Sequence, residues 1–412
     1  MARDSPPADP RSRYSRRPTA RCFNLLIERG LWRGLVMVCL AACGMHGPAG
    51  PGDSLARLEI RVSEVGLEPP WTLVDESGVV SNGEGAATVD SLSPGTYQLL
   101  PGFQPGWLPP HPAVIDLVLT AGESASAVLE YAKKRRVTAG FAVSSPTWSE
   151  DGTRVAFLDE RSGAIVSADV STGDTMILLG LDGDYTSPSW SRDGTNQIAL
   201  LRVEESAVYT FGVDADALDT LLLDCMPLDQ GSPSDLSHCG SSRELVLAID
   251  DAQGSNVYLV QDPGRGPGSC SYLFDGSPGN HATIRGPKCG PSGDRIAYAR
   301  IDRGFGQIHV WNARTENSSA VSDGISHDVD PDWDPRGTYL CMASTRPGKF
   351  SVYIADASTV GVPTRVTFPD HHEDADREPV WSPDGQIIAF SRLVAGDRDL
   401  WIVAVPKSYA AP

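Results

Sequence analysis

Residues 381–385 read Trp-Ser-Pro-Asp-Gly, and most of this sequence is organised around imperfect copies of that stretch. The copies occupy the last two-thirds of the chain. Besides the one quoted, clear copies begin at Trp148, Trp190 and Trp333, a weaker one at Cys289 and a degraded one at Cys239. The Asp-Gly pair is typical of a tight turn between two strands.

The spacing of the copies predicts a β-propeller. Successive starts are 42, 49, 50, 44 and 48 residues apart. A period in the forties with short β-rich segments inside each repeat is typical of propeller blades. Six copies predict six blades within residues 134–406. We interpret the four anchors Trp148, Trp190, Trp333 and Trp381 as structural residues packed between blades.

The sixth repeat ends before it reaches an outer strand, and the missing strand is found upstream of the first repeat. Arg135–Thr138 closely matches Thr364–Thr367, which is the predicted outer strand of the fifth blade. We therefore expect residues 135–138 to pair with the sixth blade and close the ring. Closure would cover an edge that otherwise favours aggregation.

Residues 55–132 show six or seven short alternating runs separated by turn residues, which predicts a small antiparallel β-sandwich. Leu92–Tyr97 followed by Ala121-Gly122-Glu123 resembles the prealbumin-like or PEGA-type modules of bacterial envelope proteins. That resemblance implies a spacer or adhesion-like module. Trp71 and Trp107 are candidates for a carbohydrate-binding face, although a Pro-rich loop covering a sheet edge is the favoured interpretation.

The predicted fold class is thus all-β, a six-bladed propeller with a small N-terminal antiparallel sandwich. Six repeats with these anchors resemble TolB-type propellers, the WD-repeat-like units of bacterial envelope proteins, over roughly residues 134–405. TolB itself is a soluble periplasmic protein that binds a peptidoglycan-associated lipoprotein. TolB carries a small α/β domain ahead of its propeller, and the sandwich expected here departs from that pattern. The resemblance implies a protein-binding propeller. Because the domain ahead of the propeller differs, the resemblance does not extend to the specific role of TolB.

The N-terminus is interpreted as a lipoprotein signal peptide. An Arg-rich stretch precedes the apolar run Leu35–Ala42, which is too short for a stable membrane anchor. The ending Leu-Ala-Ala-Cys resembles the bacterial lipoprotein box, which implies cleavage and lipidation at Cys43. We predict residues 1–43 as the signal, residues 44–54 as a flexible tether, and attachment to the outer membrane facing the periplasm. A secretory signal that happens to contain a Cys is the alternative.

The charge excludes some partners. The net charge is −19, and removal of residues 1–43 leaves 26 basic and 50 acidic side chains. Such acidity argues against nucleic acid and against electrostatic binding to anionic lipid. We expect a monomer that reaches the membrane only through its lipid and has another envelope protein as partner.

Five Cys residues follow Cys43, and disulfides are expected outside the cytoplasm. Cys239 and Cys289 are assigned to the Trp position of the two degenerate blades, and each follows another Cys within 20 residues. We predict the bridges Cys225–Cys239 and Cys270–Cys289. Cys341 lies between apolar residues and is predicted to be a buried thiol.

Candidate chemistry is sparse. No G-x-S-x-G nucleophile elbow occurs, and the chain resembles only the non-catalytic propeller of prolyl-oligopeptidase-type peptidases. Residues 328–332 and 371–376 hold ligand-type side chains without a Gly-bearing calcium loop. Alternation along a strand would spread the carboxylates along one face. We interpret both stretches as solvated rim loops and predict no metal, no cofactor and no catalytic residue.

The residue before the recurring Pro varies between blades and should point toward the central channel. These residues are Ser145, Ser187, Leu236, Gly286, Asp330 and Glu378. Ser145, Ser187, Asp330 and Glu378 are the channel-lining candidates, with a bound cation or a file of water as one interpretation. We favour a non-catalytic envelope protein that binds another protein. The alternatives are ligand, glycan or cation binding and, least favoured, a divergent propeller hydrolase or lyase.

Overall fold

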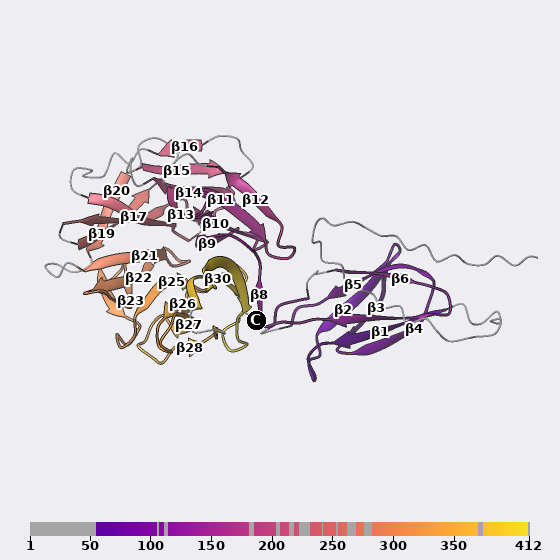
Figure 1. The fold of residues 1–412 in the computed structure, drawn as a ribbon. Helices are drawn as coiled ribbons and strands as arrows, with labels where there is room; N and C mark the ends of the chain where they lie inside the picture. Colours follow the sequence, from indigo (N-terminus) through magenta and orange to yellow (C-terminus); the bar gives the residue numbers. More distant parts are fainter. Residues whose placement is uncertain are drawn as a thin grey trace, which may run out of the picture. The chain divides into compact units, whose positions relative to one another are not determined.

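The computed structural model describes residues 55–104, 107–110, 114–180, 185–202, 207–213, 218–221, 231–240, 242–252, 254–261, 269–275, 282–369 and 374–410. Throughout these residues the regular elements are strands, β1 to β31 (Figure 1). The predicted all-β fold class is confirmed. In the same residues no helix has the length and apolar character needed to cross a membrane. The predicted lipidation site Cys43 lies outside the described part.

The first seven strands form two sheets around one core. They are β1 (Ala56–Val62), β2 (Pro70–Asp75), β3 (Gly78–Glu84), β4 (Ala87–Leu92), β5 (Gly95–Pro101), β6 (Ile115–Leu119) and β7 (Ser124–Leu129). The sheet orders are β4-β1-β7 and β3-β2-β5-β6. Alternate residues of β1 and β6 are buried, and both sheets contribute to the same apolar cluster.

Two details of this unit differ from the sequence-based prediction. The pairing of β1 with β7 is parallel, so the sandwich is not wholly antiparallel. Parallel neighbours need a long crossover, and here β2 to β6 supply it. Trp71 is buried in the core, and its indole nitrogen donates to the carbonyl oxygen of Gly85 at 3.0 Å. Trp71 therefore cannot contribute to an exposed carbohydrate face.

The described residues from Lys134 onward form six four-stranded antiparallel sheets, which we number as blades 1 to 6. Blade 1 consists of β9 (Val143–Trp148), β10 (Arg154–Asp159), β11 (Ala164–Asp169) and β12 (Thr175–Leu179). Blade 2 consists of β13 (Tyr185–Trp190), β14 (Gln197–Arg202), β15 (Ala207–Gly212) and β16 (Leu218–Leu221). Blade 3 consists of β17 (Gly231–His238), β18 (Leu245–Asp251), β19 (Gly254–Gln261) and β20 (Ser269–Asp275).

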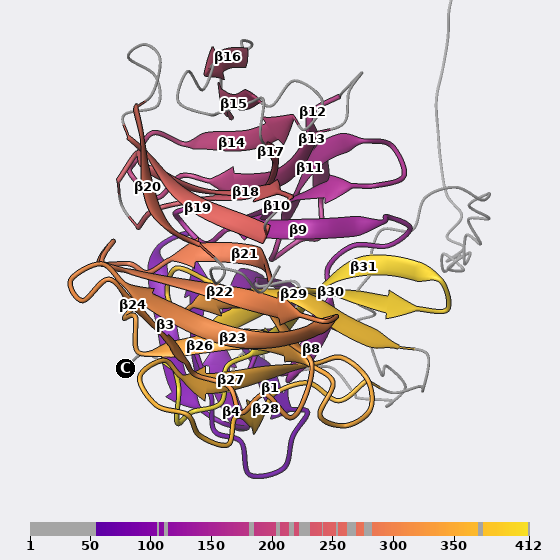
Figure 2. The same cartoon turned by 90° about the vertical axis from the view of Figure 1, so that its left-hand side faces the viewer.

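Blades 4 to 6 follow the same plan. Blade 4 consists of β21 (Thr283–Cys289), β22 (Arg295–Asp302), β23 (Phe305–Asn312) and β24 (Asn317–Ala320). Blade 5 consists of β25 (Asp328–Trp333), β26 (Tyr339–Ser344), β27 (Ser351–Asp356) and β28 (Thr364–Arg365). Blade 6 consists of β29 (Ala375–Trp381), β30 (Ile387–Val394), β31 (Asp397–Ala404) and β8 (Lys134–Arg136). Figure 2 shows β21 to β24 side by side.

The six sheets form a closed ring. Each innermost strand contacts the innermost strand of the next blade, and β29 of blade 6 contacts β9 of blade 1. The outer strand of blade 6 is β8, which pairs antiparallel with β31 through Lys134 to Arg136. A segment from before the first blade thus completes the last one.

The anchor sequence makes a hydrogen-bonded turn. In blade 6 the Ser382 hydroxyl donates to a carboxylate oxygen of Asp384 at 2.5 Å and accepts from the amide of Ile387 at 3.0 Å. Gly385 has φ of 73°, a conformation that favours glycine. Trp148, Trp190, Trp333 and Trp381 are all buried. Their burial is consistent with a role in packing the strands.

Blade 3 has a different register from the one predicted. His238 pairs with Leu245 as Trp148 pairs with Val155 in blade 1, so His238 holds the Trp position. Cys239 lies one residue later. Because of this shift, Asp235 and not Leu236 is equivalent to the residue before Pro in the other blades.

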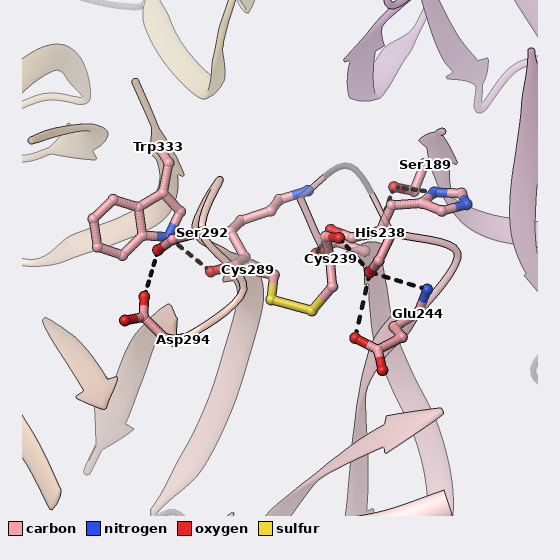
Figure 3. Close-up of a disulfide and its surroundings, with 11 residues drawn as sticks. Ser189, His238, Cys239, Glu244, Cys289, Ser292, Asp294 and Trp333 are labelled. Atoms are coloured by element: carbon pink, nitrogen blue, oxygen red, sulfur yellow. Dashed lines mark hydrogen bonds between the residues drawn. A yellow bond between two sulfur atoms is a disulfide. The ribbon is translucent and has the colours of Figure 1, made fainter. Parts of the chain in front are cut away.

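The predicted disulfide pairing is wrong. Cys239 is bonded to Cys289, 50 positions further along the chain, so neither Cys225–Cys239 nor Cys270–Cys289 forms (Figure 3). The bond joins blade 3 to blade 4, whereas the prediction paired each of the two Cys residues with the preceding Cys at a blade end. Cys270 is also disulfide-bonded, and Cys225 lies outside the described residues. The buried thiol of Cys341 is confirmed.

Candidate functional site

A bulge at the same place in five innermost strands shapes the centre of the ring. In β9 the pairing with β10 skips Ser145 and Pro146. The residue before Pro has positive φ in each of these blades: Ser145 (49°), Ser187 (51°), Gly286 (55°), Asp330 (54°) and Glu378 (52°). Proline disfavours helical conformations in the preceding residue, and positive φ is strained for residues other than glycine. Strain is therefore concentrated around the channel.

The connections of the blades define two ends of the ring, because the four strands of each sheet alternate in direction. The turns that carry the anchor sequence lie at one end, which we call the anchor end. The turns from the second to the third strand, and the crossings between blades, lie at the other end, which we call the crossing end.

A wide cavity of about 480 Å³ lies toward the crossing end. Its wall includes one residue from every blade, which lies in the bulge in five blades and is Asp235 in blade 3: Ser145, Ser187, Asp235, Gly286, Asp330 and Glu378. The four channel-lining candidates from the sequence therefore come together in one cavity. Near the mouth the wall is formed by Ile301, Gly304 and His327.

A narrow compartment of about 40 Å³ lies toward the anchor end. Each blade contributes to its lining the residue that follows the recurring Pro, or the equivalent residue in blade 3, which lacks that Pro. These residues are Thr147, Ser189, Ser237, Lys288, Asp332 and Val380. This second set was not predicted from the sequence. The Pro-x-Trp spacing contained the signal, because residues two apart on a strand share a face. Pro146, Lys288 and Val380 line both spaces, so the two are adjacent.

The acidic residues of the wide cavity bind neighbouring blades. Arg377 donates to Asp330 at 2.7 Å, and the amide of Glu378 donates to the same Asp330 oxygen at 3.1 Å. The Glu378 carboxylate accepts from the Ser391 hydroxyl at 3.0 Å. Burial, and then the charge of Asp330, raises the pKa of Glu378 to about 7. Glu378 is therefore a group that titrates near neutral pH inside the channel.

Asp235 has the same role between blades 3 and 4 that Asp330 has between blades 5 and 6. It accepts from the Ser187 hydroxyl at 3.2 Å and from the amide of Gly286 at 3.0 Å. Burial raises the pKa of Asp235. The nearby cation Arg285 is paired with Asp250 at 2.8 Å. The cations Arg285 and Arg377 on the wide-cavity wall therefore both have carboxylate partners.

The narrow compartment differs in its charges. Asp332 accepts from the backbone amide of Trp381 at 2.8 Å, and burial raises its pKa. His238 contacts Ser189 through Nδ1 at 3.1 Å (Figure 3), and burial lowers its pKa to about 4. Lys288 and Arg192 complete the compartment. Neither side chain has a hydrogen bond or ion pair with any described residue.

An aromatic cluster with one Arg flanks the mouth of the wide cavity. Phe305 is 51% exposed, and its ring centre lies 5.9 Å from that of His327. Phe350 lies 5.6 Å from His327, and the Arg377 guanidinium lies 4.3 Å from the centre of the Phe350 ring. We call these four residues the rim cluster. Aromatic residues and Arg are enriched at protein interfaces.

The acidic stretch 328–332 does not form the solvated loop that was predicted. Asp328 is buried and pairs with Arg346 at 2.6 Å. Asp330 and Asp332 have the separate partners described above, so the carboxylates do not converge. Across the described part of the chain, no group of three His, Cys, Asp or Glu is placed to hold a metal ion. Residues 371–373 lie outside that part.

Comparison with known proteins shows a TolB-like propeller. Residues 279–410 match the family model of the TolB beta propeller domain. The chain is similar to the structure of a gluconolactonase from Xanthomonas campestris, with 14% identity and a TM-score of 0.51, over 66% of this chain and 89% of that one. It is also similar to TolB from Acinetobacter baumannii, with 16% identity and a TM-score of 0.46, over 77% of this chain and 66% of that one. A TolB candidate from Agrobacterium tumefaciens shows 16% identity and a TM-score of 0.48, over 59% of this chain and 98% of that one.

At these identities the likeness to solved structures concerns the fold alone. The family match covers less than half of the chain. The class of protein defined by the fold is therefore a β-propeller, of which residues 279–410 match the TolB beta propeller family model, in a chain that also carries a two-sheet β unit before it.

Proposed function

We propose that this protein is a non-catalytic, lipid-anchored protein of the cell envelope whose propeller binds another protein. The rim cluster is the observation that carries the proposal. It places an exposed Phe, a partly buried Phe and an Arg at the mouth of a cavity. Aromatic side chains and Arg are enriched in protein interfaces, where a few residues carry most of the binding energy. The TolB-like fold supports the same class of function.

The proposed location is the periplasmic side of the outer membrane, with attachment through lipid on Cys43. The sequence Leu-Ala-Ala-Cys supports this, as does Gly44 after the Cys. Metabolic labelling with a radioactive fatty acid tests it. Label in the full chain that disappears in Cys43→Ala is expected, and equal labelling of both would contradict the anchor.

The protein-binding proposal is tested with the full chain in detergent-solubilised envelopes. Crosslinking followed by affinity capture should recover one dominant partner, and purified partner should then bind with measurable affinity. Phe305→Ala and Phe350→Ala should each weaken binding by about 10-fold or more. Tyr272→Ala is the matched control, because Tyr272 is 55% exposed on the outer strand of blade 3, far from the channel wall in its sheet. Equal binding by all variants would contradict the rim as the interface.

A hydrolase or lyase is the second candidate, and Glu378 is the observation that favours it. A buried carboxyl with a pKa of about 7 is suited to general acid–base chemistry. The solved gluconolactonase shows that a related fold can carry an enzyme. Lactone and ester screens with wild type and Glu378→Gln test this candidate. Turnover that depends on Glu378 would replace the binding proposal.

A further inference from the structure

Lys288 and Arg192 are exceptions among the cations that line the channel. Arg285 and Arg377 on the wall of the wide cavity are held in ion pairs of 2.8 Å and 2.7 Å. Lys288 and Arg192 line the narrow compartment from blades 4 and 2, and neither has a side-chain partner among the described residues. Two unpaired cations from different blades thus face one small space.

Asp332 attracts both cations, but as a single carboxylate it does not neutralise the two of them. Asp332 is the only carboxylate on its wall among the described residues, and His238 is neutral at pH 7. Thr147, Ser189 and Ser237 contribute hydroxyl groups, of which Thr147 and Ser189 already accept backbone amides of the next blade at 3.0 Å and 2.9 Å. The compartment therefore carries a net positive charge.

The size of the compartment limits what it can hold. About 40 Å³ has room for roughly two or three water-sized groups. A carboxylate has three heavy atoms, and both Arg and Lys bind carboxylates through charge-assisted hydrogen bonds. The wide cavity adjoins this compartment, and Lys288 lies on the wall of both. Val329, Pro331 and Pro379 give part of the wide cavity's wall an apolar surface.

We propose that the channel binds a ligand by its carboxylate, which lies between Lys288 and Arg192 while the body of the ligand occupies the wide cavity. The ligand is either a free organic acid or the C-terminus of a polypeptide, which share this chemistry. The inference goes beyond the proposed function and does not depend on it. A partner that binds only the rim cluster would leave the carboxylate site unaffected.

Calorimetry with the full chain in low-salt buffer without small carboxylates tests the inference. The probes are trialanine with a free C-terminus, trialanine amide, succinate and chloride. We expect trialanine or succinate to bind and the amide to bind at least about 10-fold more weakly. Binding of trialanine alone identifies a polypeptide end as the source, and binding of succinate identifies a free acid.

Substitutions at the two cations provide the second measurement. Lys288→Met and Arg192→Gln should each weaken binding of the carboxylate probe by about 10- to 100-fold. Lys407→Met and Arg314→Gln remove the same charges from exposed positions that line neither cavity and should change nothing. Arg192→Gln keeps the test valid if Lys288→Met fails to fold. Equal binding of acid and amide, binding of chloride alone, no binding of any probe, or unchanged affinity in both folded variants would overturn the proposal.

Discussion

The indole nitrogen of Trp148 donates a hydrogen bond of 3.0 Å to the carbonyl oxygen of Val380, 232 residues further along the chain. This bond joins blade 1 to blade 6. Trp333 makes the same bond to the carbonyl of Lys288 in the preceding blade, at 2.9 Å. The repeated Trp therefore does more than fill space, because it links each of these blades to its predecessor.

Replacing Trp148 should destabilise the protein through this link. Trp148→Phe keeps an aromatic ring but leaves the buried Val380 carbonyl without its donor, which costs about 1–3 kcal/mol. Trp381 is the matched control, because it holds the same position in blade 6 and its indole nitrogen has no partner in the described structure. Trp381→Phe should cost less. Urea unfolding measures both, and equal losses would contradict the role of the bond.

The disulfide replaces this link where the Trp is absent. Cys289 holds the Trp position of blade 4, and its bond to Cys239 joins it to blade 3. Closing a loop of 50 residues restricts the unfolded chain by an amount worth about 4 kcal/mol in the chain-entropy account. The double variant Cys239→Ala/Cys289→Ala should therefore melt at a lower temperature than the oxidised wild type.

Two controls accompany this prediction. Non-reducing peptide mapping should recover a fragment that joins Cys239 to Cys289. Reductant should lower the melting temperature of the wild type by more than that of the double variant, since only the wild type loses this bond. A mapped Cys225–Cys239 fragment would contradict the structure and restore the pairing expected from the sequence.

The ring and its closure were predictable because their signals are local. The likeness between residues 135–138 and 364–367 extends to individual bonds. Arg136 donates through Nε to the carbonyl of Thr138 at 2.8 Å, and Arg365 does the same to Thr367 at 2.9 Å. Blade 3 was not predictable in this way. It lacks both Trp and the aligned Pro, so its register depends on the pairing of β17 with β18, and the disulfide error followed from that register.

The closing strand gives a matched pair of substitutions. The Thr138 hydroxyl accepts from the buried amide of Leu400 at 3.0 Å, and that of Thr367 accepts from the amide of Val352 at 2.9 Å. Thr138→Val and Thr367→Val should each cost about 1–3 kcal/mol, since each leaves a buried amide unpaired. Similar losses in denaturant unfolding are expected. A neutral Thr138→Val beside a costly Thr367→Val would show that β8 does not close the ring in solution.

The channel was predictable in part. Alignment on Pro located the variable residues that line the wide cavity, because a repeated position must occupy equivalent places around a ring. The alignment did not reveal which groups of the neighbouring blades pair with the acidic side chains among these residues. Arg377 of blade 6 pairs with Asp330 of blade 5, and Asp235 binds the amide of Gly286 in the next blade. Such contacts join residues about one period apart, and their geometry depends on how neighbouring sheets pack.

Glu378 should make stability depend on pH. Its pKa is raised from 4.5 to about 7 by burial and by the charge of Asp330. In the unfolded chain the carboxyl ionises near the ordinary value, whereas the folded protein keeps the proton until about pH 7. Because the folded state binds more protons between these values, the free energy of unfolding falls as pH rises through this window. The loss is complete above pH 7 and amounts to roughly 3 kcal/mol.

Glu378→Gln removes the titrating group and should reverse that loss. At pH 8 the variant should be more stable than wild type by roughly 3 kcal/mol, because it has no buried charge to accommodate. At pH 4 the advantage should disappear, since Glu378 is then uncharged in both states. Urea unfolding at the two values measures the difference. Glu160→Gln, at an exposed position in blade 1, is the control and should change neither value. An equal gain at pH 4 and pH 8 would mean that Gln packs better, and that the ionisation of Glu378 is not the cause.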